Sequence, residues 1–163
     1  MGYLTAIALG YLLGCSNMAL YISKLKKIDL RDGGSGNLGA SNATALLGWR
    51  IGILVALHDI GKAALAVMLA KLYFPDLPLA GAVAGVASVL GHIFPFCLKF
   101  KGGKGLASYF GMVLALNWKL ALIIGAVIVL ATLITDFISV GALSSIVVAP
   151  VYTFFTTHNL ILV

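Results

Sequence analysis

The fold depends on residues 91–108, GHIFPFCLKFKGGKGLAS, a short polar segment in a very apolar chain. An apolar run ends at Pro95, three lysines and three glycines follow between Lys99 and Gly105, and another apolar run begins at once. Glycine lets the backbone turn its N–H groups toward one point, and lysine supplies positive charge. If a helix starts here, its first N–H groups add to the same field. The segment therefore predicts an anion site, most naturally for phosphate, between two helices at a membrane surface.

The composition indicates an integral membrane protein. Of the 163 residues, 61% are hydrophobic and 10% are charged, and the mean hydropathy is +1.09. Soluble domains carry roughly 25% charged residues. The net charge of +6 has no soluble face on which to gather, so we expect no nucleic-acid partner. We expect no disulfide framework and no metal, because Cys15 and Cys97 lie in or beside apolar runs and Cys97 is poorly spaced from His92 for joint ligation.

Six apolar runs predict an all-α, polytopic transmembrane helix bundle, organised as one domain over residues 1–163. A span needs roughly 20 residues. The first run carries its basic residues after the apolar part, which favours an uncleaved span over a signal peptide. The fourth run is short, so its helix is expected to begin inside the glycine segment. The predicted spans are Gly2–Tyr21, Ile51–Phe74, Leu79–Phe94, Gly105–Leu116, Leu120–Thr135 and Phe137–Phe155.

Two further segments complete this expectation. Residues 43–50 suggest a short interfacial helix before the second span. A seventh apolar run begins at Leu160 and the sequence stops at Val163, so we expect a seventh helix that is truncated.

A second polar segment, residues 29–42 (DLRDGGSGNLGASN), is also rich in Gly, Ser and Asn. If the N-terminus lies outside, both polar segments face the cytoplasm and can converge. Cytoplasmic loops carry an excess of Lys and Arg, so the charges test this orientation. The inside loops then hold Lys24, Lys26, Lys27, Arg31, Arg50, Lys99, Lys101 and Lys104, and the outside turns hold Lys71 and Lys119.

Each feature also has a purely structural interpretation. The loop 102–105 is not a P-loop, because Lys104 is followed by Gly105, and such loops often only turn a corner between helices. Asp59 and Lys62 share a helix face and are expected to form a structural ion pair. His92 is expected mainly to bond carbonyls freed near Pro95. Two polar loops on one side of so apolar a chain nevertheless cost free energy unless they line a hydrated site.

These segments resemble the motifs of bacterial acyl-phosphate:glycerol-3-phosphate acyltransferases, and the resemblance covers essentially the whole chain. Three departures stand out. Ala45 occupies the place of a family arginine, and Ala142 the place of a family serine. The family's third motif, His-Arg-x-Asn, does not occur before Val163, and His158-Asn159 is not that motif. The matching residues are 29–31 (DLR), 34–42 (GSGNLGASN), 91–95 (GHIFP), 100–105 (FKGGKG), Ala107-Ser108 and the pair Asp59 and Lys62.

The resemblance implies transfer of a fatty acyl group from acyl phosphate to the 1-hydroxyl of glycerol 3-phosphate, in the bacterial inner membrane. Acyl phosphate is already activated, so neither a cofactor nor a Ser or Cys nucleophile is needed. The attacking hydroxyl can give its proton to the acyl phosphate itself. The expected catalytic residues are Lys104, Ser35 and Asn37, and the expected phosphate-binding residues are Gly36, Gly39, Ser41, Asn42, His92, Lys101, Gly102, Gly103 and Gly105.

Two alternatives remain open from the sequence. A small anion channel or transporter also combines glycine-rich loops with an ion pair inside a span. Such a protein should place its polar site near the membrane midplane, whereas both segments here fall at one surface. A degenerate relative that only binds lipid or partner enzymes is supported by Ala45 and Ala142.

Overall fold

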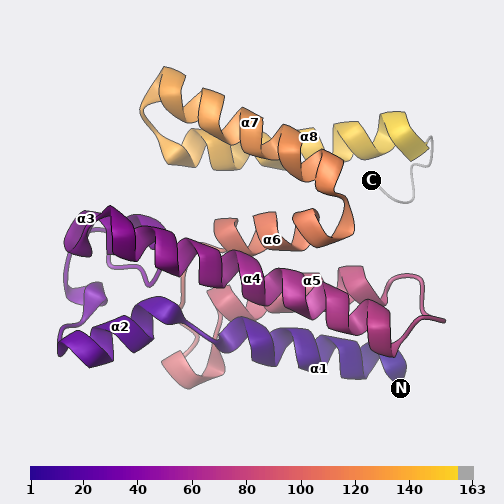
Figure 1. Ribbon diagram of the computed structural model, residues 1–163, viewed down its shortest axis with the longest axis horizontal. Coiled ribbons are helices and arrows are strands. Elements are labelled where there is room, and N and C mark those ends of the chain that lie inside the picture. The colour runs from indigo at the N-terminus through magenta and orange to yellow at the C-terminus, as the bar shows by residue number, and fades with distance from the viewer. Residues whose placement is uncertain (158–163) are drawn as a thin grey trace. The chain divides into compact units, whose positions relative to one another are not determined.

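The computed structural model describes residues 1–157, apart from the side chains of Ile138, Ile146 and Thr157. The described part is helical and contains no strand (Figure 1). It divides into two compact units, the first over Met1–Leu116 and the second from Asn117 onward. The expectation of a single domain stays a prediction. The predicted seventh run at Leu160–Val163, together with His158 and Asn159, lies outside the described residues.

The first unit holds most of the helices and both polar segments. Its α-helices are joined by two short 3-10 turns, one in each polar segment. The α-helices are α1 (Gly2–Cys15), α2 (Met18–Lys26), α3 (Ala40–Leu47), α4 (Trp49–Tyr73), α5 (Ala80–Ile93) and α6 (Leu106–Leu116), and the 3-10 turns are η1 (Leu30–Asp32) and η2 (Phe96–Leu98).

The first predicted span is not one helix. The chain leaves the helical conformation at Ser16, and Asn17 caps a new helix by accepting a hydrogen bond from the Leu20 N–H at 2.9 Å. Asparagine is among the preferred residues at a helix N-terminus, because its side chain satisfies one of the free N–H groups there. Figure 1 shows α2 continuing beyond this break. The predicted first span is therefore interrupted at the polar Ser16-Asn17 pair, although Gly2–Lys26 as a whole is long and apolar enough to cross a membrane.

Five segments are long and apolar enough to cross a membrane, and the sixth predicted span is shorter. Helix α6 has 11 residues, about 16 Å of helix, against a hydrocarbon core of roughly 30 Å. It begins at Leu106, directly after the glycine-rich residues 102–105, whereas the sequence predicted a start within them. The predicted interfacial helix is α3, which ends before Gly48. The five segments are Gly2–Lys26, Trp49–Tyr73, Ala80–Leu98, Trp118–Thr135 and Ser139–Thr156.

Small residues allow close helix packing in the first unit. A Cβ on Gly10 would collide with the backbone of Ala84, and one on Gly14 with the backbone of Ser88. Residue numbers increase in the same direction along both helices in these two pairs, so α1 and α5 run parallel, with their backbones in contact. Glycine is what permits this approach in membrane helices.

The remaining contacts fix the direction of the other helices. Lys71 lies against Gly81 and Lys62 against His92, so α4 and α5 run antiparallel. Gly105 lies against Ile93, at the start of α6 and the end of α5. The break between α1 and α2, the beginning of α4, the end of α5 and the beginning of α6 therefore lie toward the same end of this unit. Both polar segments are at that end.

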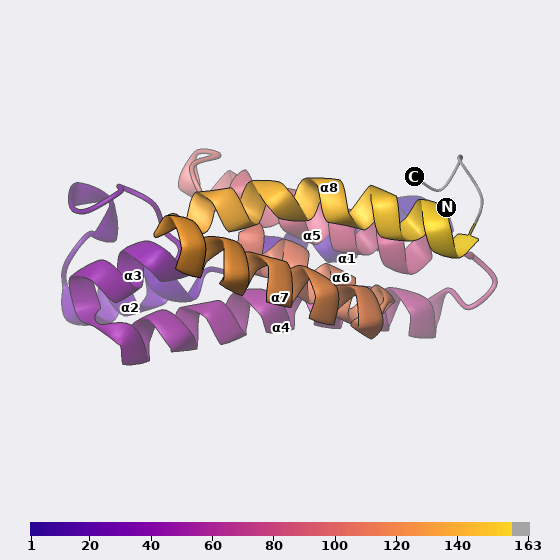
Figure 2. The same ribbon diagram turned by 90° about the horizontal axis from the view of Figure 1, so that it is seen from above.

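The second unit is a helical hairpin of α7 (Trp118–Thr135) and α8 (Ile138–Thr157), which lie side by side in Figure 2. Asn117 caps α7 by accepting from the Leu120 N–H at 3.1 Å, and Asp136 makes the turn with a φ of 58°. Both helices agree with the predicted spans to within a few residues.

Candidate functional site

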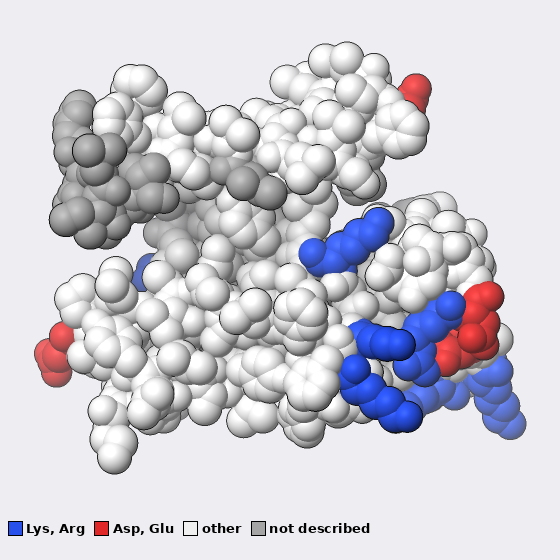
Figure 3. All heavy atoms as spheres, turned by 180° about the vertical axis from the view of Figure 1, so that it is seen from behind, with Lys and Arg blue, Asp and Glu red and all other residues white. Residues whose placement is uncertain are grey.

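Lys and Arg side chains gather over the end of the first unit that carries the polar segments (Figure 3). One of these cations is already balanced. The Arg31 guanidinium lies 2.6 Å from the carboxylate of Asp29, and these hydrogen bonds lower the pKa of Asp29 to about 2. In the second polar segment, Lys101 and Lys104 are exposed, so their ammonium groups are accessible to a soluble anion.

The second polar segment folds back onto the end of α5. The N–H of Gly102 donates to the carbonyl of Ile93 at 3.0 Å, and the N–H of Gly103 donates to the carbonyl of His92 at 3.1 Å. The last carbonyls of a helix need such partners, and Pro95 has no N–H to offer. In this structure these two amides are therefore not free to bind phosphate, which differs from the role expected for them.

Backbone N–H groups without a partner inside their helix lie at the start of α6, directly after this loop. The first bond of this helix runs from the Tyr109 N–H to the Gly105 carbonyl at 2.8 Å. The N–H groups of residues 106–108 precede that bond and have no partner within the helix. The Ser108 hydroxyl is fully buried and has no hydrogen-bond partner within residues 1–157. Since Gly105, with a φ of 86°, brings Lys104 directly before this helix, ammonium and helix N-terminus can act on the same anion.

Asn42 organises the first polar segment from inside. Its side-chain amide donates to the carbonyls of Leu30, at 2.7 Å, and Asn37, at 3.0 Å, and its oxygen accepts from the Ser35 N–H at 2.8 Å. The side chain is buried, and both amide protons are used. Asn42 therefore shapes the loop in this structure, and it has no donor left for the expected contact with a substrate.

The other polar residues of this segment are nearer the surface. Ser35 and Ser41 are exposed, and Asn37 is half-buried with its amide donating to the Ser35 carbonyl at 3.2 Å. Gly36 makes a turn with a φ of 69°, and the carbonyl of Gly39 accepts the first bond of α3, from the Ala43 N–H. These side chains can meet a ligand that approaches from the open side of the loop.

The two polar segments meet at Gly103. A Cβ on this glycine would collide with Nε2 of His92 and would lie 3.2 Å from the carbonyl oxygen of Leu38 in the first segment. The same Leu38 carbonyl oxygen accepts a hydrogen bond from the side-chain amide of Asn17 at 3.1 Å. The convergence that the sequence suggested is thus made through Leu38 and Gly103, where only glycine fits.

A buried polar cluster lies beneath this contact. The Lys62 ammonium lies 2.9 Å from the carboxylate of Asp59 and 2.8 Å from Nδ1 of His92, and it donates to the carbonyl of Ser16 at 2.6 Å. His92 was expected to bond carbonyls near Pro95, but its side chain faces Lys62 instead. The hydroxyl of Tyr11 takes that role, donating to the carbonyl of Phe94 at 2.8 Å.

Sequence reasoning missed the part of this cluster contributed by the break between α1 and α2. The Ser16 hydroxyl lies 3.0 Å from Nε2 of His58 and 3.0 Å from the hydroxyl of Tyr21. Asn17 is buried in the same region. The signal was present, because Ser16 and Asn17 are an isolated polar pair in an apolar run, and asparagine favours helix starts.

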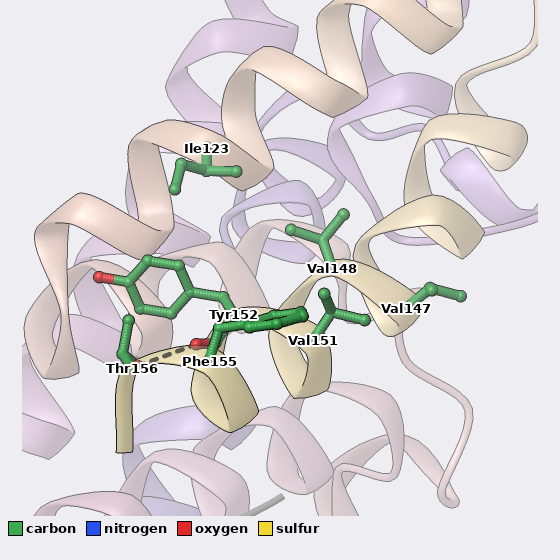
Figure 4. Close-up of a pocket in the computed structure, with 7 residues that line it drawn as sticks. All are labelled: Ile123, Val147, Val148, Val151, Tyr152, Phe155 and Thr156. Atoms are coloured by element: carbon green, nitrogen blue, oxygen red, sulfur yellow. Dashed lines mark hydrogen bonds between the residues drawn. The ribbon is translucent and has the colours of Figure 1, made fainter. Parts of the chain in front are cut away.

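The pocket of the second unit does not suit a phosphate. Its lining is apolar apart from Tyr152 and Thr156, and the Thr156 hydroxyl donates back to the carbonyl of Tyr152 at 2.8 Å (Figure 4). The pocket is lined by Ile123 of α7 and by Val147, Val148, Val151, Tyr152, Phe155 and Thr156 of α8.

Comparisons with known proteins agree on one family. Residues 4–163 match the family model described as glycerol-3-phosphate acyltransferase. Glycerol-3-phosphate acyltransferase 1 of Oceanobacillus iheyensis is 38% identical over 162 residues, which are 95% of this chain and 78% of the relative. The glycerol-3-phosphate acyltransferase of Coxiella burnetii (strain CbuG_Q212) is 39% identical over 154 residues, covering 94% of this chain and 79% of the relative.

Two crystal structures of PlsY, an integral membrane glycerol 3-phosphate acyltransferase, share the fold. The glycerol 3-phosphate form has a TM-score of 0.88 and 35% identity, covering 95% of this chain and 78% of that chain. The lysophosphatidic acid form has a TM-score of 0.86 and 34% identity, covering 95% of this chain and 77% of that chain.

Proposed function

Because the chain belongs to the glycerol-3-phosphate acyltransferase family, we propose that it transfers a fatty acyl group from acyl phosphate to the 1-hydroxyl of glycerol 3-phosphate. The products are lysophosphatidic acid and inorganic phosphate, and the setting is phospholipid synthesis in a bacterial inner membrane. Because acyl phosphate is already activated, this reaction calls for no cofactor.

The observation that carries this proposal is the meeting of the two polar segments at Gly103 and Leu38. Both substrates bear a phosphate, so the enzyme needs two anion sites side by side. One segment supplies Lys104 and the start of α6, and the other supplies Ser35, Asn37 and Ser41. This arrangement supports binding of a soluble phosphate ester next to an acyl phosphate held in the membrane.

The chemistry needs charge neutralisation more than a nucleophile from the protein. The 1-hydroxyl oxygen of glycerol 3-phosphate bonds to the acyl carbon, and the bond from that carbon to the phosphate oxygen breaks. The hydroxyl proton leaves with the inorganic phosphate. Lys104 and the free N–H groups at the start of α6 would stabilise the charge that develops on that phosphate.

The other expected residues support this reaction in two ways. Ser35 and Asn37 would orient the glycerol hydroxyls, and Ser41 and Lys101 would bind phosphate. The glycines act through the backbone. Those that shape the loops around the substrates are Gly36, Gly39, Gly102, Gly103 and Gly105.

We also propose that the N-terminus lies outside and that the site faces the cytoplasm. Helix α4 has Arg50 at one end and Lys71 at the other, and the beginning of α4 lies toward the end with the polar segments. Apart from Lys62 and Lys71, all Lys and Arg residues of the first unit belong to that end. The positive-inside rule then places that end in the cytoplasm, where glycerol 3-phosphate is found.

The direct test is acyl transfer from palmitoyl phosphate to radiolabelled glycerol 3-phosphate by the purified protein. We expect labelled lysophosphatidic acid and release of one phosphate for each acyl group. We expect Lys104→Ala to lower kcat/KM by about a hundredfold or more, the effect of removing one charge-stabilising donor. Lys71→Ala, at the other end of α4, should retain activity.

Two results would contradict the proposal. Labelled phosphate crossing proteoliposomes without acyl transfer would favour a transporter. Lipid binding without turnover from any acyl donor would favour a non-catalytic relative, in line with Ala45 and Ala142.

A further inference from the structure

Lys62 makes a complete set of hydrogen bonds inside the first unit. An ammonium group has three protons and accepts none. Its nitrogen lies 2.6 Å from the Ser16 carbonyl oxygen, 2.9 Å from Oδ1 of Asp59 and 2.8 Å from Nδ1 of His92. Three donors therefore meet three acceptors, from three different helices or helix ends, and the lysine is buried.

With Lys62 charged, this geometry favours one tautomer of His92. Nδ1 also lies 3.4 Å from Oδ1 of Asp59, but its contact with Lys62 is the shorter one. An ammonium can only donate, so Nδ1 must be the acceptor in that contact. A neutral imidazole with an accepting Nδ1 carries its proton on Nε2.

Nε2 is the atom of His92 that lies against the glycine loop. A Cβ on Gly103 would collide with it, so the ring edge packs directly on the backbone one residue before Lys104. The carbonyl of the same histidine accepts the Gly103 N–H at 3.1 Å. His92 therefore contacts this loop through both its backbone and its ring.

We propose that Lys62 is a positioning residue that keeps His92 neutral at Nδ1, so that Nε2–H is presented as a donor at the Gly103–Lys104 loop. The ligand of that donor is a phosphate oxygen of a substrate bound at the loop, and this part rests on the proposed acyl transfer. Lys62 also fixes the carbonyl of Ser16, and so couples the break between α1 and α2 to the same loop. Asp59 balances the lysine charge.

The first test is the protonation state of His92, measured by ¹⁵N NMR on histidine-labelled protein. We expect a resonance pair with Nδ1 unprotonated and Nε2 protonated, assigned by its loss in His92→Gln. In Lys62→Met, Asp59 is left as the only charged group beside Nδ1, so we expect Nδ1 to become protonated. This measurement needs no turnover, and therefore it is independent of whether the acyl transfer proposal holds.

The second test is a double-mutant cycle in kcat/KM. We expect Lys62→Met to lower kcat/KM by about tenfold to a hundredfold, the range for losing a hydrogen bond with a charged group. If Lys62 acts through His92, the same substitution has little further effect in a His92→Gln background. The matched control is Lys71→Met in the same helix, whose ammonium donates to the Ala115 carbonyl at 3.0 Å. It should leave the spectrum unchanged and kcat/KM within about twofold.

The results separate clearly. A protonated Nδ1 in the wild-type protein would overturn the proposal, and so would losses that multiply in the double variant. The wild-type spectrum alone is decisive if Lys62→Met does not fold, since assignment can then come from His58→Gln and His158→Gln. If the spectrum is as expected but the protein transfers no acyl group, the tautomer of His92 stands and the proposed acyl transfer is refuted.

Discussion

At the scale of single residues, Gly103 is the position where a small change should do most harm. A Cβ there would run into the His92 ring and approach the Leu38 carbonyl. We expect Gly103→Ala to push the two polar segments apart, which should lower the free energy of unfolding by about 1–3 kcal/mol and lower kcat/KM as well.

The control for Gly103→Ala is Gly61→Ala in α4. A Cβ on Gly61 has nothing within 4 Å, and alanine is the better helix former. This variant should keep full activity and melt at the same temperature or slightly higher. Equal activity in both variants would show that the contact at Gly103 is unimportant.

The sequence indicated the residues of the site better than their roles. The spacing of the polar segments predicted two loops on one side, and both loops are at one end of the first unit. It did not predict that the Gly102 and Gly103 amides bond to α5, or that Asn42 is buried. Those roles depend on which carbonyls the folded chain leaves without partners, and periodicity carries no such information.

At the scale of helices, the break between α1 and α2 is the feature that links the fold to the site. Asn17 makes two separate bonds there, one from its oxygen to the Leu20 N–H and one from its amide to the Leu38 carbonyl. The first starts α2 and the second holds the first polar segment in place. Apolar run length alone could not reveal this break, because the sequence is apolar again from Met18 to Ile22.

The two N-cap asparagines give a matched pair of variants. Asn17→Ala and Asn117→Ala should each lower the free energy of unfolding by about 1 kcal/mol, the usual value of such a cap. Only Asn17→Ala should also lower kcat/KM, since Asn117 caps α7 and makes no recorded bond to either polar segment in the described part of the chain. Thermal unfolding in detergent and the acyl transfer assay measure the two effects. Equal kinetics in both variants would contradict the role given to Asn17.

At the scale of the whole molecule, the proposed activity requires a fixed orientation of the protein in the membrane. In a background with Cys15→Ser and Cys97→Ser, we introduce Asp76→Cys in the turn before α5 or Lys27→Cys after α2. A membrane-impermeant maleimide added to intact cells should label the protein with Asp76→Cys. It should label the protein with Lys27→Cys only after permeabilisation, and the reverse pattern would place the site outside.

The central claim is that both polar segments act on one pair of bound phosphates. The most direct measurement is a double-mutant cycle with Ser35→Ala in the first segment and Lys104→Ala in the second, read as kcat/KM for acyl transfer. Residues that share one site couple by about 0.5–3 kcal/mol, whereas distant, independent residues add. We predict that the double variant loses clearly less than the product of the two single losses. Losses that multiply would contradict the account, because the two segments would then act independently.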